Sequence, residues 1–280
     1  MAVNENKQGA ALMPGFMKQQ PAVQQMKTLG GVFVILLVAI AILVYNTNRD
    51  AAHGTAYVAA AGEMRMLSQR MAKASTLALQ GNPVAFAQLK ESRETFSQLL
   101  DRVTSGGEVA GTSVPPSPLA VRPQLEALAT VWSDADKDAL VVIGQEANLL
   151  ALGKSVATID NENPVILELT EQVAALKLQA SASAREIAAA NQLVMLTQRL
   201  AKNASALLVG DEINPEVAFL LGKDVNAFRD ILAGLGRGSG DSDTRAKLEE
   251  LDKAFKSYQA AIGAILGNMQ PLVLAKQAGA

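Results

Sequence analysis

An octapeptide occurs twice in this chain of 280 residues. The first copy, MLSQRMAK, runs from Met66 to Lys73, and the second, MLTQRLAK, runs from Met195 to Lys202. The copies differ only by Thr for Ser and by Leu for Met. A chain that repeats a segment at one long offset is expected to build the same structural unit twice, because each copy carries the same local preferences. The repeat therefore favours a tandem architecture.

The correspondence between the two halves extends well beyond the octapeptide. Gly81 and Gly210 share its offset, and an Asn-Pro pair follows each of them, at 82–83 and at 214–215. Further matches follow in the same order, namely Phe96 with Phe228, Leu99-Leu100 with Ile231-Leu232, Leu125–Trp132 with Leu248–Phe255, and Gly144 with Gly267. One unit of about 120–130 residues therefore occurs twice.

Each unit is predicted to be helical. Aromatic residues make up 4% of the chain and hydrophobic residues 49%, with abundant Ala and Leu, which favour helices over strands. Apolar residues before the first Asn-Pro pair recur at three- and four-residue steps and form one stripe, Met64, Leu67, Met71, Ala74 and Leu77. Gly81 suits the end of this helix, Asn82 the N-cap of the next, and Pro83 its first turn.

The remaining helices are placed by the same patterns. A second helix carries Phe86 to Val103 and ends at Thr104–Gly107, and a Gly- and Pro-rich loop without strands follows over Glu108–Pro118. A third helix carries Leu125 to Val142 and turns near Gly144–Asn148. A fourth helix is predicted to break at DNENP, Asp160–Pro164, and a long helix is predicted from Val165 to Val209. Ala260–Ala275, interrupted by Gly, Asn and Pro, is expected to form bundle helices.

An apolar segment near the start predicts a membrane anchor. No charged residue lies between Lys27 and Arg49, and the enclosed run Leu29–Tyr45 is apolar throughout. Such a run can cross a hydrocarbon layer of about 30 Å as a helix. The lysines before it place residues 1–28 in the cytoplasm and the chain after about residue 47 outside. A cleaved signal peptide is the alternative, but the small residues Val58–Gly62 lie far beyond the apolar run.

The resulting fold expectation is all-α. Membrane-anchored tandem antiparallel four-helix-bundle units are stacked along a long helical rod. The expected divisions are a cytoplasmic tail over 1–28, a transmembrane helix over 29–47, a membrane-proximal sensing unit over 48–160 and a membrane-distal sensing unit over 161–280.

Composition argues against enzymatic chemistry. The chain has no cysteine and one histidine, His53, which excludes thiol nucleophiles, most zinc sites and serine triads. The acidic runs Asp134–Asp138 and Leu248–Leu251 lie in amphipathic helix patterns and indicate solvated faces. We therefore expect no enzyme, no cofactor and no metal. A formal net charge of −2 gives no indication of a nucleic-acid partner.

Two motifs resemble a known family. AGEMRMLSQRMAKAS, Ala61–Ser75, and PPSPLAVRPQ, Pro115–Gln124, resemble the N-terminal sensing region of the type IV pilus methyl-accepting chemotaxis transducers of the PilJ family. The resemblance implies a homodimeric periplasmic receptor region with the pilin subunit as a possible ligand. It also implies output through a cytoplasmic adaptor and a CheA-type kinase that controls type IV pili, surface sensing and twitching motility. Because that output region would follow Ala280, the chain is expected to be a fragment.

A weaker resemblance connects the same stretch to nitrate and nitrite sensor kinases. It implies that Arg65 meets an oxyanion at a dimer axis, with Ser68 and Gln69 beside it, since a guanidinium pairs well with planar oxyanions. Val194 stands in place of Arg65 in the second copy.

Three alternatives stay open at this point. Arg65 can be a plain surface or interface residue, the chain can be a non-signalling envelope scaffold, and the repeated motif can be a packing segment with ion-paired or solvated cover. The residues of that motif are Met66, Leu67, Gln69, Arg70, Ala72, Lys73, Met195, Leu196, Gln198, Arg199, Ala201 and Lys202.

Overall fold

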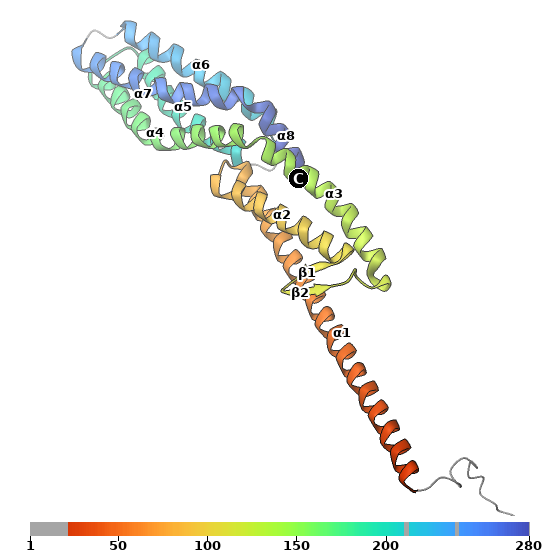
Figure 1. Cartoon of the computed structure of the whole chain (residues 1–280). Helices are drawn as coiled ribbons and strands as arrows, with labels where there is room; N and C mark the ends of the chain where they lie inside the picture. The colour runs from red at the N-terminus through yellow and green to blue at the C-terminus, as the bar shows by residue number, and fades with distance from the viewer. Residues whose placement is uncertain (1–21, 210–212, 239–240, 280) are drawn as a thin grey trace, which may run out of the picture.

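The computed structural model describes residues 22–209, 213–238 and 241–279. The molecule is an elongated rod of helices (Figure 1). Its first helix, α1, runs without interruption from Ala22 to Leu79. Over residues 29–45 no other part of the described chain covers α1, and the large apolar side chains there are at least half exposed. Among the described residues this is the one helix that is by itself long and apolar enough to cross a membrane. The apolar run and the first copy of the octapeptide therefore lie on one continuous helix.

The turn that ends α1 follows the predicted chemistry. Gly81 has a φ of 76°, a conformation that glycine adopts without penalty. The Asn82 side chain caps α2, Pro83–Ser105, by accepting from the backbone N–H of Val84 at 3.0 Å. Asn214 caps α6, Pro215–Gly238, by accepting from the Glu216 N–H at 2.9 Å. The two Asn-Pro signals therefore act alike. Gly210 lies outside the described residues.

The loop after α2 contains a small hairpin that the sequence patterns did not predict. Strands β1, Gly107–Val109, and β2, Thr112–Val114, pair antiparallel. Ala110 and Gly111 between them both have positive φ, as a two-residue hairpin turn of type I′ requires. The strands form because Val109 and Val114 are buried against α1 and α2. The Tyr57 hydroxyl on α1 also donates to the Pro115 carbonyl just after β2. The expectation of a strand-free loop is therefore wrong.

Two expectations on the following helices are also wrong. After a 3-10 turn, Leu119–Val121, helix α3 spans Arg122–Gly144 and turns at Gln145 into α4, Glu146–Gln179, as predicted. However, α4 passes through DNENP with Pro164 inside it. An internal proline costs about 3 kcal/mol, but Ile159 and Ile166 on either side are fully buried. The Ser257 hydroxyl on the neighbouring helix also donates to Glu162. Tertiary packing therefore overrides the local break.

The long helix predicted from Val165 to Val209 is divided in two. α4 ends at Gln179, and α5 spans Ala184–Val209. Ser183 and Glu186 form a reciprocal capping box, in which Ser183 Oγ accepts from the Glu186 N–H at 3.3 Å and a Glu186 oxygen accepts from the Ser183 N–H at 3.2 Å. This S-x-x-E pattern is readable in the sequence and was missed.

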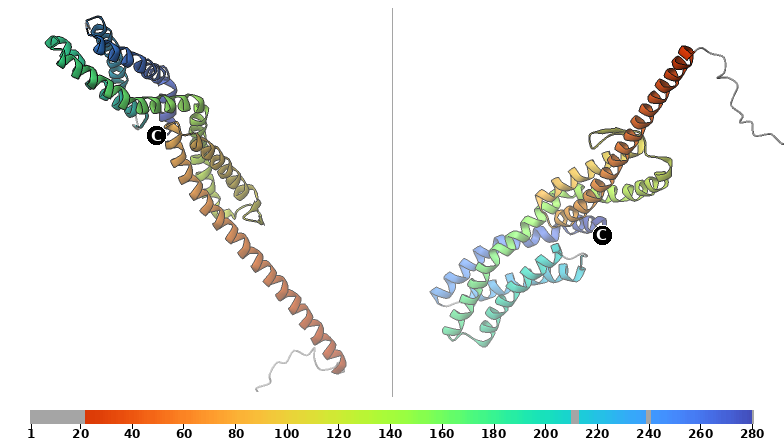
Figure 2. Two further views of the ribbon diagram at one scale, coloured as in Figure 1. Left: turned by 90° about the vertical axis from the view of Figure 1, so that its left-hand side faces the viewer. Right: turned by 90° about the horizontal axis from the view of Figure 1, so that it is seen from below.

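The last helices complete two bundles that exchange an element. Helices α4, α5, α6 and α7, Ser242–Gly267, pack around one core. Helix α8, Met269–Gly279, then leaves them and packs against α1 and α3 (Figures 1 and 2). Thus α4 leaves the first unit for the second bundle, while α8 of the second unit joins the first. The expected division at 160/161 falls inside α4.

Matching aromatic pairs show the repeat inside the cores. Phe96 on α2 stacks on Trp132 of α3 with ring centroids 4.2 Å apart. Phe228 on α6 stacks on Phe255 of α7 at 4.0 Å. Each unit therefore joins its second and third helices by the same contact. The expected all-α tandem fold is confirmed.

Gly81 also provides a test of the junction between the bundles. A Cβ on Gly81 would lie 2.5 Å from the Leu149 carbonyl oxygen and 2.9 Å from Gly153 Cα, both on α4. A Cβ on Gly111, whose φ is 75°, would meet nothing within 4 Å. We expect Gly111→Ala to cost about 1 kcal/mol through φ alone. Gly81→Ala should cost about 1–3 kcal/mol more through overpacking.

The measurement is the thermal unfolding midpoint of the two variants, followed by circular dichroism. Equal midpoints would contradict the close approach of the α1–α2 turn to α4.

Candidate functional site

The two copies of the octapeptide occupy equivalent places in the two bundles. Leu67 and Leu196 are buried, while Met66, Met195 and both glutamines, Gln69 and Gln198, are exposed. Lys73 and Lys202 are exposed, Ala72 is exposed and Ala201 is half-buried. Each copy therefore turns two apolar side chains to its core, Leu67 and the half-buried Met71 in the first and Leu196 and Leu200 in the second, and a polar face outward.

The arginine of each copy joins its helix to the next one. Arg70 on α1 pairs with Glu91 of α2 at 2.8 Å, and Arg199 on α5 pairs with Asp224 of α6 at 2.6 Å. The partners differ in burial, because the Glu91 side chain is 64% exposed and that of Asp224 only 3%. Both arginines therefore form ion pairs with the neighbouring helix, which agrees with the interpretation of the motif as a packing segment.

The candidate ligand residues on α1 do not converge on one cavity. Arg65, Ser68 and Gln69 are exposed, and the Ser68 hydroxyl donates to the Arg65 carbonyl at 2.8 Å. Within the described chain, no ion pair or side-chain hydrogen bond engages the Arg65 guanidinium. Ser68 alone of the three lines a groove of about 340 Å³ between α1 and α3, whose lining also includes Phe96, Trp132 and Gly279 of α8.

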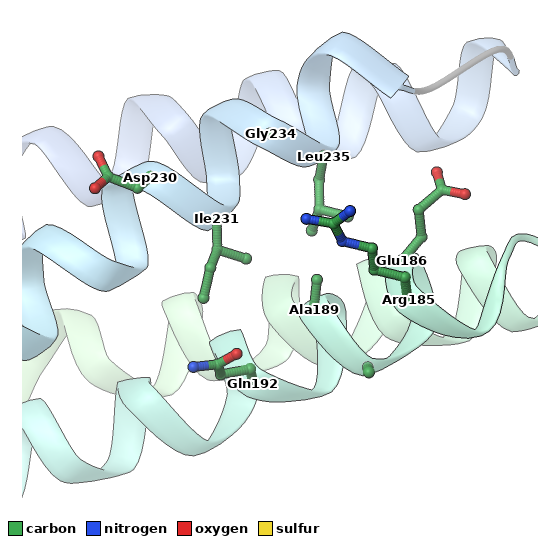
Figure 3. A pocket seen from close by; sticks show the side chains of 9 residues that line it. Arg185, Glu186, Ala189, Gln192, Asp230, Ile231, Gly234 and Leu235 are labelled. Carbon is green, nitrogen blue, oxygen red and sulfur yellow. The ribbon is translucent and has the colours of Figure 1, made fainter.

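A larger cleft lies in the second unit, between the first half of α5 and the second half of α6 (Figure 3). Its volume is about 610 Å³. Small and apolar side chains form much of its wall and Arg185, Glu186, Gln192 and Asp230 supply its polar groups. In Figure 3 the Arg185 guanidinium points from α5 towards α6, and Ile231 projects from α6 into the space between the helices. The sequence patterns did not predict this cleft.

Both carboxylates that line the cleft have cationic partners. Glu186 pairs with the Lys177 ammonium at 2.8 Å, and Asp230 lies 3.2 Å from the Arg229 guanidinium. The hydrogen bond from Lys177, followed by those from Ser183, lowers the pKa of Glu186 from 4.5 to about 2. Arg185 has no such partner in the described part of the chain. The cleft therefore carries one uncompensated positive charge.

Across the described residues, no three or more His, Cys, Asp or Glu side chains gather as a metal site would require. The structure thus offers two candidate binding features, an exposed guanidinium on α1 and a cationic cleft between α5 and α6.

Comparison with known proteins finds a family whose model matches most of the chain. A family model described as the N-terminal region of type IV pili methyl-accepting chemotaxis transducers (PilJ) matches residues 47–158 and 177–280. Each stretch contains one copy of the octapeptide.

Two relatives agree with this match. Protein PilJ of Pseudomonas aeruginosa is 28% identical over 261 residues, which cover 89% of this chain and 38% of that protein. The putative methyl-accepting chemotaxis protein AlkN of Alcanivorax borkumensis is 25% identical over 235 residues, which cover 81% of this chain and 33% of that protein. The chain thus spans well under half of the length of either relative.

The two motif arginines should differ in their effect on stability. Removing Arg70 breaks an exposed pair, so we expect Arg70→Ala to cost less than about 1 kcal/mol. Removing Arg199 leaves the buried Asp224 carboxylate without its cation, so we expect Arg199→Ala to cost about 3–5 kcal/mol.

Denaturant titration of both variants measures this difference. The double variant Arg199→Ala/Asp224→Ala should recover part of the loss, because it leaves no buried charge. Equal losses from the two single variants would contradict the assignment.

The lowered pKa of Glu186 predicts a pH dependence of stability. A carboxyl whose pKa is lower in the folded than in the unfolded protein stabilises the fold above its unfolded value, and that stability is lost as the pH falls through the folded value. The native protein should therefore exceed Glu186→Gln in stability at neutral pH. This advantage should shrink between pH 4.5 and about 2.

Unfolding midpoints of both proteins across this pH range provide the test. Ser183→Ala removes one of the hydrogen bonds that lower the pKa of Glu186, so it should narrow the pH range over which the stability changes. A difference in stability that stays constant down to pH 2 would contradict the lowered pKa of Glu186 in the folded protein.

Proposed function

The chain belongs to the PilJ family of type IV pili methyl-accepting chemotaxis transducers, whose N-terminal region it matches, and on this premise we propose that it is the sensing region of a transmembrane chemoreceptor. Residues 1–28 lie in the cytoplasm, 29–47 cross the inner membrane and the remainder forms a periplasmic sensor. Its membrane-proximal and membrane-distal units, for which we expect the ranges 48–160 and 161–280, are the two parts of this sensor, and α4, Glu146–Gln179, is common to both ranges.

The observation that carries this proposal is the continuity of α1. One helix holds both the apolar run and the first copy of the motif. From residue 47 to Leu79 it rises about 50 Å, at about 1.5 Å per residue. A shift of the bundle against α1 is therefore transmitted along a rigid element to the membrane. Small shifts between discrete packings are available to helical bundles.

The exposed face of α1 supports a homodimer. Val58 is 74% exposed and Met66 51% exposed, and Arg65 and Gln69 lie on the same outward side. Apolar groups exposed beside polar ones are typical of a surface that meets a partner. A second copy of the chain, in contact along residues 58–69, would bring two copies of the motif together.

Input and output are proposed from the family. The pilin subunit is the proposed input, and a cytoplasmic adaptor with a CheA-type kinase is the proposed output, acting on pilus extension and twitching motility through a region that follows residue 280. The greater length of both relatives supports such a region.

A small oxyanion is a second candidate input, supported by the exposure and the unengaged guanidinium of Arg65. In a dimer two such groups could hold one planar anion. A non-signalling scaffold is the remaining alternative, and it requires no response of α1 to any ligand.

The chain lacks cysteine, which allows a direct test of dimer and input together. Single cysteines replace Met66 or Gln69 in the membrane-embedded full chain, and disulfide cross-linking is measured with and without purified pilin. We expect cross-linked dimers whose rate of formation changes when pilin is added. Leu67→Cys is the matched control and should not cross-link, because Leu67 is only 3% exposed.

Each alternative has its own outcome in this experiment. Absence of cross-links at both exposed positions would refute the dimer. Cross-linking that responds to nitrate, and no longer does so in Arg65→Ala, would favour the oxyanion. Cross-linking that responds to neither would favour the scaffold.

A further inference from the structure

The cleft between α5 and α6 is the open counterpart of a filled space in the first unit. The repeat pairs Ala60 with Ala189 on the first helices, and Leu99 with Ile231 on the second helices. In the first unit Ala60 is 1% exposed and Leu99 6%. In the second unit Ala189 and Ile231 are half-buried and line the cleft. The same helix pair is therefore closed in one unit and open in the other.

The β-hairpin accounts for the difference. In the first unit Val109 and Val114 belong to the same buried cluster as Ala60 and Leu99. In the second unit α6 ends at Gly238 and α7 begins at Ser242, so the connection has no room for a hairpin like that of residues 107–114. The second unit therefore has no counterpart of the two valine side chains beside this helix pair.

Charge also distinguishes the two places. Arg185 stands where the first unit has the buried Ala56. A cation in the first turn of a helix interacts unfavourably with the helix dipole, so helix stability does not explain this arginine. The neighbouring Glu186 and Asp230 are already paired. The cleft therefore combines an apolar wall with one guanidinium that is available to an anion.

We propose that this cleft binds a small aliphatic monocarboxylate. Its carboxylate pairs with Arg185 through charge-assisted hydrogen bonds, and its branched or short apolar body lies against Ala189, Ile231 and Leu235, as the valines do in the first unit. The volume of about 610 Å³ falls in the range of small-molecule sites. This site lies far along the chain from Arg65 and does not rest on the signalling role proposed above, since binding is measured on the protein itself.

Isovalerate is the probe, titrated by calorimetry into the full chain in nanodiscs, with empty nanodiscs as background. We expect saturable binding that Arg185→Gln weakens by about tenfold or more, as the loss of a charged hydrogen-bond partner should. The neutral isostere isovaleramide should bind more weakly by a similar factor. Arg122→Gln, which removes an exposed arginine of the other unit, should leave binding unchanged.

A second pair of variants tests the location. A Cβ on Gly234, which lines the cleft, or on Gly236, which does not, would meet nothing within 4 Å. Both leucine variants should therefore fold, which circular dichroism checks. Gly234→Leu should abolish isovalerate binding by filling the cleft, whereas Gly236→Leu should retain it.

Several results would overturn the proposal. These are the absence of saturable binding to the folded protein, equal binding of isovaleramide, and unchanged binding in Arg185→Gln or Gly234→Leu. A synthetic peptide of residues 106–115 forms the last arm. If this peptide binds the cleft and isovalerate does not, the occupant is a polypeptide and not a small carboxylate.

Discussion

The structure depends on α1, a single helix whose first part is exposed and apolar and whose second part packs in a bundle. Over residues 29–45 α1 is apolar on all sides, and no other part of the described chain covers it. Beyond residue 56 it keeps a single buried stripe, Ala56, Ala60, Met64 and Leu67, against α2 and the hairpin. Since one helix runs through both parts, a rigid movement of the stripe would also move the apolar part. The remaining helices are arranged around that constraint.

The repeated motif contributes to the packing of both bundles. In both copies a leucine enters the core and an arginine pairs with an acid on the next helix. The differences between the units are more informative than the likeness. Arg65 corresponds to Val194, and Ala56 corresponds to Arg185. Arg65 and Arg185 therefore lie on different parts of the first helices of the two units, and both lie outside the repeated octapeptide.

Local patterns predicted most of the fold. The apolar stripe of α1, the turn at Gly81 and both asparagine caps depend on neighbouring residues alone, so they could be predicted from the sequence. Pro164 predicted a break that the packing of Ile159 and Ile166 prevents, and the hairpin forms because Val109 and Val114 find a core far along the chain. The cleft at Arg185 could not be predicted either, since it also depends on contacts between residues far apart in the chain. Its opening is visible only when the two units are compared in space.

The exchange of α4 and α8 has a consequence for how such a chain can be divided. The fourth helix of each unit lies in the bundle of the other, so a cut in the middle of α4 would not release two intact halves. The first bundle would lose α8, and the second would lose the beginning of α4. A duplicated protein usually keeps its copies as separable modules, but here each copy completes the other. Neither half of the described chain therefore holds a complete bundle on its own.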